Sequence, residues 1–357
     1  MSDRASRLAN TLPDIGADLL VVTSLVNVRY LTGFTGSNGM VLVGADTRTF
    51  VTDFRYVEQS AAEVDSGFDR TIAQTELMDM IGDLLPSGEL RLAFEDAHMS
   101  VRTHGRLREL APERVSLVPG GDAVETLRAV KDSEEVHRIG EASKVADAAL
   151  RQIMEQGLAG RTERSVAVAL ERAMEDLGAQ GPSFGTIVAA GPHGALPHAQ
   201  PRDVEIGSND LVVIDWGAEL DGYCSDCTRT LATGDLPDET LEAYDLVREA
   251  QLAGLNAVTA GAGGREADSA ARDVIDGAGH AEHFGHGLGH GVGMEIHEAP
   301  RLSQRSDSVL ASGNVVTVEP GVYLPGQFGV RIEDLVVVTD GACQILTSVP
   351  KELITVG

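Results

Sequence analysis

The stretch from Phe284 to Pro300, FGHGLGHGVGMEIHEAP, combines many side chains that can bind metals or move protons. It contains three histidines, two glutamates and five glycines in seventeen residues. Glycine allows positive φ and close backbone approach, so the alternating glycines predict that His286 and His290 lie in a cramped, bent segment. The alternative is a glycine-rich surface loop with incidental histidines. The spacing fits neither G-x-G-x-x-G nor H-E-x-x-H, because Val292 and Arg301 occupy the deciding positions.

Four carboxylates and one histidine form a set that could surround metal ions: Asp215, Asp226, Glu319, Glu333 and His290. The acids in LVVIDWG and VVTVEPG follow apolar, strand-like runs, where an uncompensated charge is costly to bury. Something cationic is therefore expected opposite them. Arg229 near Asp226, or Arg331 near Glu333, could form a structural ion pair instead. That alternative explains one acid at a time and does not explain all five residues together.

The types of these ligands predict the metal and the chemistry. Oxygen-rich ligation with one imidazole suits Mn²⁺, Co²⁺ or Zn²⁺, and we expect Mn²⁺ first. Two bridging carboxylates would hold two ions about 3.5–4 Å apart around a shared water. Two cations lower the pKa of that water, so that a hydroxide nucleophile forms near neutral pH. The set therefore predicts two divalent metal ions and metal-assisted hydrolysis.

A weak internal repeat indicates how the acids are brought together. Residues 208–215, SNDLVVID, match residues 312–319, SGNVVTVE, since each has a turn, a β-forming run and a final carboxylate. A second acidic segment follows each unit, and predicted helices at residues 165–177 and 267–277 precede them in matching order. The pattern predicts duplicated αβ halves that face each other across a site.

Length and pattern predict two domains, residues 1–122 and 123–357. The first has the alternation of a small α/β domain, which Pro119-Gly120-Gly121 ends. Its predicted helices are residues 4–12, 56–64, 76–85 and 101–110, and its predicted strands are residues 17–23, 40–43, 49–52 and 91–95. The second domain adds predicted helices at residues 136–156, 238–259 and 265–277 and a strand at residues 183–189.

Composition excludes several classes of partner. The formal net charge of −27 argues against a nucleic-acid backbone or an anionic membrane. No apolar run approaches a membrane span and the N-terminus has no secretory signal, so a cytoplasmic protein is expected. Three cysteines fit a reducing compartment. Cys224 and Cys227 form a C-x-x-C, but residues three apart on a strand lie about 10 Å apart, too far for a disulfide.

Several motifs in the two domains can be compared with a known family. The second domain contains DWG with SDCTRT, HGLGHGVG with IHEAP, VEPGVY and RIED, and the first contains NVRYLTGF and TDFRY. Together they resemble the prolidase, aminopeptidase P and creatinase group of pita-bread metallopeptidases, and most of all its Xaa-Pro dipeptidases. The resemblance implies a small N-terminal α/β creatinase-type domain followed by a pseudo-twofold pita-bread catalytic domain.

The resemblance also implies roles for single residues. Asp215 and Asp226 would bind one ion, His290 the other, and Glu319 and Glu333 would be shared ligands. Three histidines match substrate-side positions of the group: His198, His286 and His297. A bridging hydroxide would attack the scissile carbonyl, a metal and a histidine would stabilise the oxyanion, and Glu319 would pass the proton to the leaving amine.

The predicted reaction is hydrolysis of the Xaa-Pro bond, with Xaa-Pro dipeptides as the expected substrates. The bond is a tertiary amide without N–H, so proteases that hydrogen-bond that group do not recognise it. The alternative is an Xaa-Pro aminopeptidase that acts on longer peptides. A metal-free creatinase-like hydrolase and a non-catalytic interaction protein on the same fold are more remote alternatives, because they would not need all five ligands.

Substrate length and assembly depend on further residues. A dipeptidase must cap the substrate carboxylate with a cation, and Arg331 and Arg55 are available for this role. Arg331 lies two residues before Glu333, and orienting that acid is its expected role. The resemblance implies a homodimer in which the N-terminal domain borders the partner's site, and Phe34 and Tyr56 are expected to be exposed there.

Overall fold

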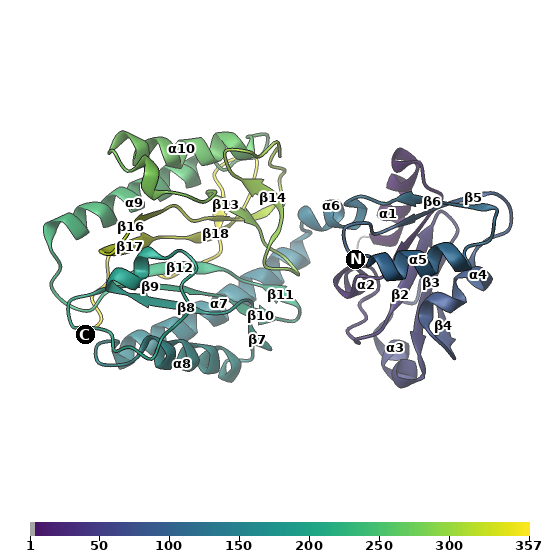
Figure 1. Ribbon diagram of the computed structural model, residues 1–357, viewed down its shortest axis with the longest axis horizontal. Coiled ribbons are helices and arrows are strands. Elements are labelled where there is room, and N and C mark those ends of the chain that lie inside the picture. Colours follow the sequence, from purple (N-terminus) through teal and green to yellow (C-terminus); the bar gives the residue numbers. More distant parts are fainter. Residues whose placement is uncertain (1–3) are drawn as a thin grey trace. The chain divides into compact units, whose positions relative to one another are not determined.

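The computed structural model describes residues 4–357 and divides into two compact units. The first unit ends at Arg128 and the second runs from Ala129 to Gly357, so that the division falls within helix α6 (Ala123–Ala129) (Figure 1). Both units combine helices with β-sheets, which confirms the expected mixed α/β class. In the described part of the chain, no helix is both long and apolar enough to cross a membrane.

The first unit is built on a mixed six-stranded sheet with the order β4-β3-β2-β1-β5-β6. The β1–β2 and β2–β3 pairs are antiparallel, and the other pairs are parallel. The strands are β1 (Leu19–Val22), β2 (Met40–Gly44), β3 (Arg48–Asp53), β4 (Asp69–Ala73), β5 (Leu90–Phe94) and β6 (Val115–Pro119). The helices are α1 (Arg4–Thr11), α2 (Leu25–Thr32), α3 (Val57–Glu63), α4 (Ile81–Leu84) and α5 (Val101–Leu110).

Three elements of the first unit lie outside the sequence prediction: α2, β4 and β6. Strand β4 is an edge strand that begins with exposed residues, so it lacks the apolar pattern that identifies strands. Helix α2 is anchored by tertiary contacts, since the Asn27 amide donates hydrogen bonds to Glu95 at 2.7 Å and Glu125 at 2.6 Å. The helix predicted at 76–85 is instead a 3₁₀ turn (Leu77–Met80) followed by the single turn of α4.

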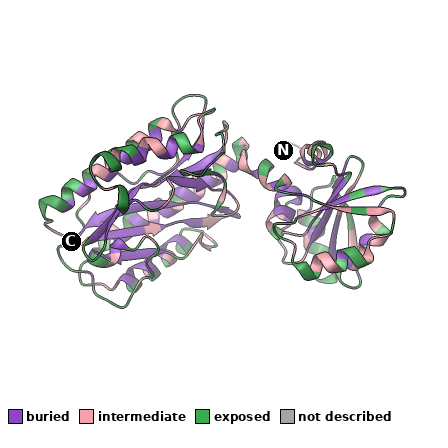
Figure 2. Cartoon of the chain, turned by 45° about the horizontal axis from the view of Figure 1, so that its top comes forward, coloured by how far each residue is buried: buried purple, intermediate pink, exposed green. Residues whose placement is uncertain are grey.

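The second unit places its strands between two pairs of helices, as Figure 1 shows. The helices are α7 (Ser133–Gln156), α8 (Glu163–Asp176), α9 (Asp238–Ala257) and α10 (Gly264–Gly277). The strands are β7 (Gly181–Pro182), β8 (Ile187–Ala190), β9 (Leu211–Trp216), β10 (Ala218–Leu220), β11 (Tyr223–Cys224), β12 (Cys227–Ala232), β13 (Gly289–Gly291), β14 (Glu298–Leu302), β15 (Val315–Val318), β16 (Gly321–Leu324), β17 (Phe328–Arg331), β18 (Asp334–Val337) and β19 (Gln344–Ile345). Figure 2 shows that most strand residues are buried, whereas the helices expose their outer faces.

The two halves of the second unit repeat one arrangement. In the first half, α7 and α8 pack on a core that includes β8 and β9, and β9 pairs antiparallel with β12. In the second half, α9 and α10 pack on a core that includes β15, and β15 pairs antiparallel with β18. The matching order confirms the duplication that the sequence repeat predicts. Each half therefore brings the end of one strand beside a second strand that follows an acidic residue.

The C-x-x-C segment differs from the prediction, because it is not one continuous strand. Cys224 ends β11 and Cys227 begins β12, and Asp226 lies in the break between them. Both thiols are buried and free. Burial raises the pKa of Cys224 to about 12, so this thiol stays protonated and unreactive near neutral pH. The break leaves Asp226 outside the regular strand pairing, where its side chain can turn into the site.

Candidate metal centre and active site

A cavity of about 820 Å³ lies within the second unit. Its lining includes every residue that the sequence assigned to metal binding or catalysis: Asp215, Asp226, His290, Glu319, Glu333, His198, His286, His297 and Arg331. Asp215 lies on β9 and His290 on β13, whereas the other three predicted ligands lie next to strand ends. The two halves of the unit thus supply the ligands from both sides, as the repeat predicts.

Three of the acids converge on one point. Ligand oxygens of Asp215, Asp226 and Glu333 lie within 4.8 Å of one another. Asp215 Oδ1 and Glu333 Oε1 are buried and accept no hydrogen bond within the described residues. Burial first, and then the neighbouring carboxylates, raise the pKa of Asp226 and Glu333 well above the usual range. Buried like charges of this kind are stable as anions only with a cation among them, so the residues fit a metal site.

His290 completes the set with a free ring nitrogen. Its Nδ1 lies 3.0 Å from the Gly291 carbonyl oxygen and therefore carries the proton. The lone pair of Nε2 then faces Glu319 Oε1 at 3.4 Å and Asp226 Oδ2 at 3.6 Å. Burial lowers the pKa of His290 to about 3, so the ring is neutral, as a metal ligand must be.

The glycines beside His290 are required by close backbone packing. A Cβ on Gly289 would overlap the Thr317 carbonyl oxygen, and a Cβ on Gly291 would overlap the Ala299 carbonyl oxygen. The close approach expected from the sequence is therefore present. The expected positive φ is not, because both glycines lie on β13 with ordinary backbone angles. These residues bring His290 against β15, from which Glu319 follows.

Arg331 orients Asp215, which differs from the expectation that it orients Glu333. Its Nη2 donates to Asp215 Oδ2 at 2.6 Å, and its Nε donates to Thr228 Oγ1 at 3.0 Å. Thr228 in turn donates to Glu333 Oε2 at 2.7 Å. The expectation assumed that residues two apart on one strand share a face. Strand β17 ends at Arg331, so this alternation does not continue to Glu333. Arg331 and Thr228 leave one oxygen of each acid free for a cation.

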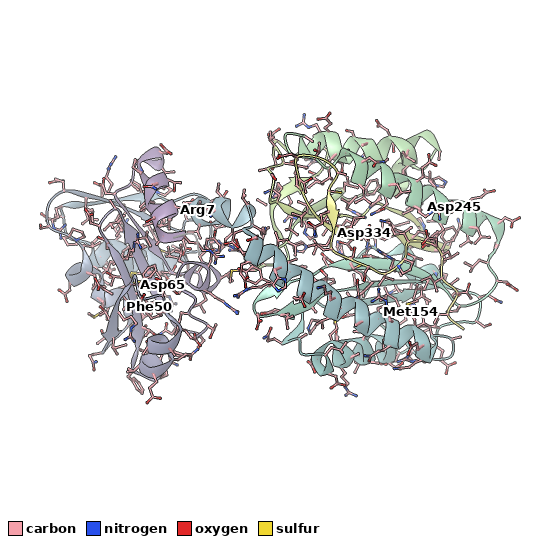
Figure 3. All side chains as sticks on the ribbon, turned by 180° about the vertical axis from the view of Figure 1, so that it is seen from behind. Arg7, Phe50, Asp65, Met154, Asp245 and Asp334 are labelled. Atoms are coloured by element: carbon pink, nitrogen blue, oxygen red, sulfur yellow. The ribbon has the colours of Figure 1, made fainter. Side chains whose placement is uncertain are left out.

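A second buried arginine supports the backbone behind Glu333. Arg229 donates to Asp334 Oδ1 at 2.8 Å and to the Val349 carbonyl oxygen at 2.6 Å, and it also bonds the Glu333 carbonyl oxygen. Lys351 pairs with the other oxygen of Asp334. Burial alone would raise the pKa of Asp334, but Arg229 and Lys351 outweigh burial and hold it below its usual range. Figure 3 shows Asp334 in the interior of the second unit.

The three predicted substrate-side histidines differ in availability. The Nδ1 of His286 lies 2.8 Å from the Gly287 carbonyl oxygen, and its Nε2 accepts from the Tyr323 hydroxyl at 2.9 Å. Both of its ring nitrogens are therefore occupied, and burial lowers its pKa to about 4. The imidazoles of His198 and His297 are more exposed, and neither is hydrogen-bonded to any described residue. These two rings are the ones free to meet a substrate.

Arg301 is a cavity residue that the sequence did not single out. Arg301 lies on β14 directly opposite His290 in the β13–β14 pair, and it lines the cavity. Among residues 4–357, no acid forms an ion pair with its guanidinium, in contrast to Arg331. The available signal was its place in HEAPR, four residues after His297, because strand alternation puts Arg301 on the same face as that histidine.

The chain is similar to known proteins along its whole length. Residues 137–340 match metallopeptidase family M24, and residues 4–130 match the creatinase/prolidase N-terminal domain. An uncharacterized peptidase of Bacillus subtilis is 43% identical over 352 residues, which cover 98% of this chain and 99% of that protein.

Two solved structures resemble the molecule closely. An Xaa-Pro dipeptidase from Bacillus anthracis superposes with a TM-score of 0.94 at 40% identity, covering 99% of both chains. An X-Pro aminopeptidase from Thermotoga maritima has a TM-score of 0.91 at 36% identity, covering 99% of this chain and all (100%) of that one. With the second unit matched, the ligand set in one cavity and similarity over the full chain, this protein belongs to metallopeptidase family M24.

Proposed function

We propose that this protein hydrolyses the Xaa-Pro bond of dipeptides with the help of divalent metal ions. The observation that carries the proposal is the meeting of all five predicted ligands in one cavity, which also contains Arg301, an arginine without an ion pair to any described acid. The relatives support it, because the Bacillus anthracis protein with the same fold is named an Xaa-Pro dipeptidase.

Two divalent ions, preferably Mn²⁺, would be held by the five donors. Asp215 and Asp226 would bind one ion and His290 the other, while Glu319 and Glu333 would bind both. Such ions supply Lewis acidity to the scissile carbonyl and lower the pKa of a water molecule. The donor set fits this role, since buried oxygens of Asp215 and Glu333 otherwise have no partner within the described residues.

The chain's own groups would bind the substrate and move the proton. Thr317 holds the Glu319 carboxylate by donating a hydrogen bond at 3.0 Å, and Glu319 would carry a proton to the leaving proline nitrogen. His198 and His297 would donate hydrogen bonds to the substrate from the cavity wall. His286 would act through Tyr323, whose hydroxyl accepts from Arg331 at 2.8 Å, and thus hold Arg331 in place.

Arg301 would select dipeptides. It is a cation at the cavity wall that forms no ion pair with an acid in the described part of the chain, whereas Arg331 is committed to Asp215. Arg55, the other arginine considered from the sequence, is paired with Asp53 at 2.8 Å. A guanidinium recognises a carboxylate with two parallel hydrogen bonds, so the free C-terminus of an Xaa-Pro dipeptide is a suitable partner for Arg301.

Replacing Arg301 with methionine is expected to raise the KM for Ala-Pro by about 10- to 100-fold, the value of one or two charged hydrogen bonds. The rate with Ala-Pro-Ala should change little, because its carboxylate lies one residue further away. Arg164→Met is the matched control, since Arg164 also lines the cavity but pairs with Asp203 at 3.0 Å.

The same comparison separates the two activities. A wild-type protein that cleaves Ala-Pro-Ala as well as or better than Ala-Pro would be an Xaa-Pro aminopeptidase, the activity named for the Thermotoga maritima protein. An equal loss of activity toward both peptides in Arg301→Met would contradict the recognition of the dipeptide carboxylate by Arg301. No hydrolysis of either peptide by the metal-loaded protein would favour the non-catalytic alternative.

A homodimer is the proposed assembly, with a different contact surface from the one expected. Phe34 is buried and packs edge-to-face against Phe50, with ring centroids 4.8 Å apart, so it cannot form an interface. Phe54 is an exposed aromatic residue of the same unit, at 76%, and Val57 nearby in the chain is 44% exposed. Apolar side chains grouped on a surface in this way are suited to contact with a second copy.

Phe54→Asp is expected to weaken self-association and to lower activity, if this surface borders the partner's site. Light scattering at assay concentration should give the mass of two chains for the wild type and of one chain for the variant. Val101→Asp is the control, because Val101 is 89% exposed in the same unit but lies on a different element. A fully active wild-type monomer would rule the dimer out.

A further inference from the structure

One part of the cavity lining comes from a segment that starts with a 3₁₀ helix (Gly191–Ala195) and whose two ends return to one acid. Residues 191–202, here called the His198 loop, contribute Pro197, His198 and three further residues to the cavity lining. His198 is the only metal- or proton-binding side chain of the loop in this lining. Its ring makes no hydrogen bond to any residue from 4 to 357, so its position depends on the backbone that carries it.

Glu163 binds the first end of the His198 loop. The Ala190 N–H, just before the loop, donates to Glu163 Oε1 at 3.0 Å. His193 Nδ1 lies 3.0 Å from each of the two Glu163 oxygens. Both groups precede His198 in the chain, so they fix how the loop leaves β8.

The second end of the His198 loop returns to the same carboxylate. The Arg202 N–H donates to Glu163 Oε2 at 3.0 Å. The Arg202 guanidinium binds both oxygens, with Nε at 3.0 Å from Oε2 and Nη2 at 2.9 Å from Oε1. One acid therefore closes the loop from both ends.

Glu163 is itself held rigidly at the start of α8. Thr162 caps the helix by accepting from the Ser165 N–H at 3.1 Å, and the Glu163 N–H donates to the Val204 carbonyl oxygen at 3.1 Å. The side chain of Glu163 is only 1% exposed. Burial alone would raise the pKa of Glu163, but the hydrogen bonds from Arg202, Ala190 and the other donors outweigh burial and lower it to about 2. The acid is therefore ionised at any working pH.

The middle of the loop is fixed to the metal centre. Arg331 donates from Nη1 to the Pro197 carbonyl oxygen at 3.1 Å, and the same arginine holds Asp215. His198 follows Pro197 directly. The loop is thus held at both ends by Glu163 and next to His198 by the arginine that orients a predicted metal ligand, and the Arg202 carbonyl oxygen also accepts from the Arg164 N–H at 3.0 Å.

We propose that Glu163, with Arg202, is a positioning residue that sets the place of His198 against the metal centre. This inference rests on the proposed function, in which His198 contacts the substrate. Glu163 does not line the cavity and does not touch the substrate. Its effect passes through the His198 loop, and an error of about 1 Å in the position of a catalytic group can cost about 10²-fold in rate.

The test combines kinetics with a double-mutant cycle. Glu163→Gln is expected to lower kcat/KM for Ala-Pro by about 10²-fold, and Arg202→Met to lower it less, while the metal affinity measured by calorimetry stays at the wild-type value. In the His198→Ala background, Glu163→Gln should have little further effect, because both changes act through one imidazole. Asp203→Asn is the control, as it removes the exposed ion pair of Asp203 with Arg164 at the same helix start.

Hydrogen exchange measures the anchoring separately from catalysis. Amides in residues 191–202 should exchange faster in Glu163→Gln and Arg202→Met, and at the wild-type rate in Asp203→Asn. Unchanged exchange in both variants would overturn the anchoring. If the losses of kcat/KM caused by Glu163→Gln and by His198→Ala combine fully in the double mutant, Glu163 does not act through His198. Should Glu163→Gln fail to fold, Arg202→Met decides both points, because the Arg202 side chain is 46% exposed. Full activity of His198→Ala would instead overturn the role given to His198 in the proposed function.

Discussion

Replacing Glu333 or Asp226 with alanine is expected to reduce hydrolysis of Ala-Pro by at least about 10³-fold, even with excess divalent metal. Both carboxylates are buried, and no arginine among the described residues donates a hydrogen bond to Asp226. Metal ions contribute several kcal/mol of transition-state stabilisation, and each 1.4 kcal/mol is about tenfold in rate. Chelation of the wild type should have the same effect, and adding metal back should restore the activity.

Elemental analysis gives a readout independent of turnover. The wild type is expected to contain two divalent ions per chain, and each variant one or none. Asp245→Ala is the control, because Asp245 is an exposed acid on α9, at the edge of the second unit in Figure 3. If both site variants keep near wild-type turnover after chelator treatment, the two-metal centre is wrong.

Arg331→Met is expected to lower both stability and catalysis. The change leaves Asp215, Thr228, Tyr323 and the Pro197 carbonyl oxygen without their shared donor. Removing one partner of a buried ion pair costs about 3–5 kcal/mol, because the other charge remains buried. We expect a lower Tm in the metal-free protein and a decrease in kcat of about 10²-fold or more.

Arg331→Lys separates charge from geometry. A lysine keeps the positive charge near Asp215 but cannot reach four acceptors at once, so it should recover stability in part and kcat only slightly. Denaturant unfolding and steady-state kinetics on the two variants measure this difference. Full recovery of kcat by lysine would show that Arg331 acts through its charge alone.

The positions of Asp215 and Glu319 in the cavity could be predicted from sequence because each acid follows an apolar, strand-like run. A buried carboxylate in such a place needs a cation, and that requirement does not depend on the details of packing. The duplication then indicated which acids lie together. His290 was predicted for a related reason, since glycines on both sides of a histidine permit close backbone packing, which the structure shows at Gly289 and Gly291.

Other features depend on contacts between residues far apart in the chain. Arg331 binds Asp215, 116 residues away, and nothing near Arg331 in the sequence indicates this choice. Phe34 was expected to be exposed, but it is buried against Phe50 and Tyr56. Arg301 gains importance only because β14 places it opposite His290. The periodicity of a segment specifies its faces, but the partner of each face is decided by the assembled fold.

The contacts of Arg229 and Lys351 connect the cavity to a segment that does not line it. Backbone oxygens of Val349 and Pro350 accept from Arg229, and Lys351 pairs with Asp334 next to Glu333. Residues 349–351 are not part of the cavity lining. A substitution in this segment can therefore change the position of Glu333 from outside the cavity.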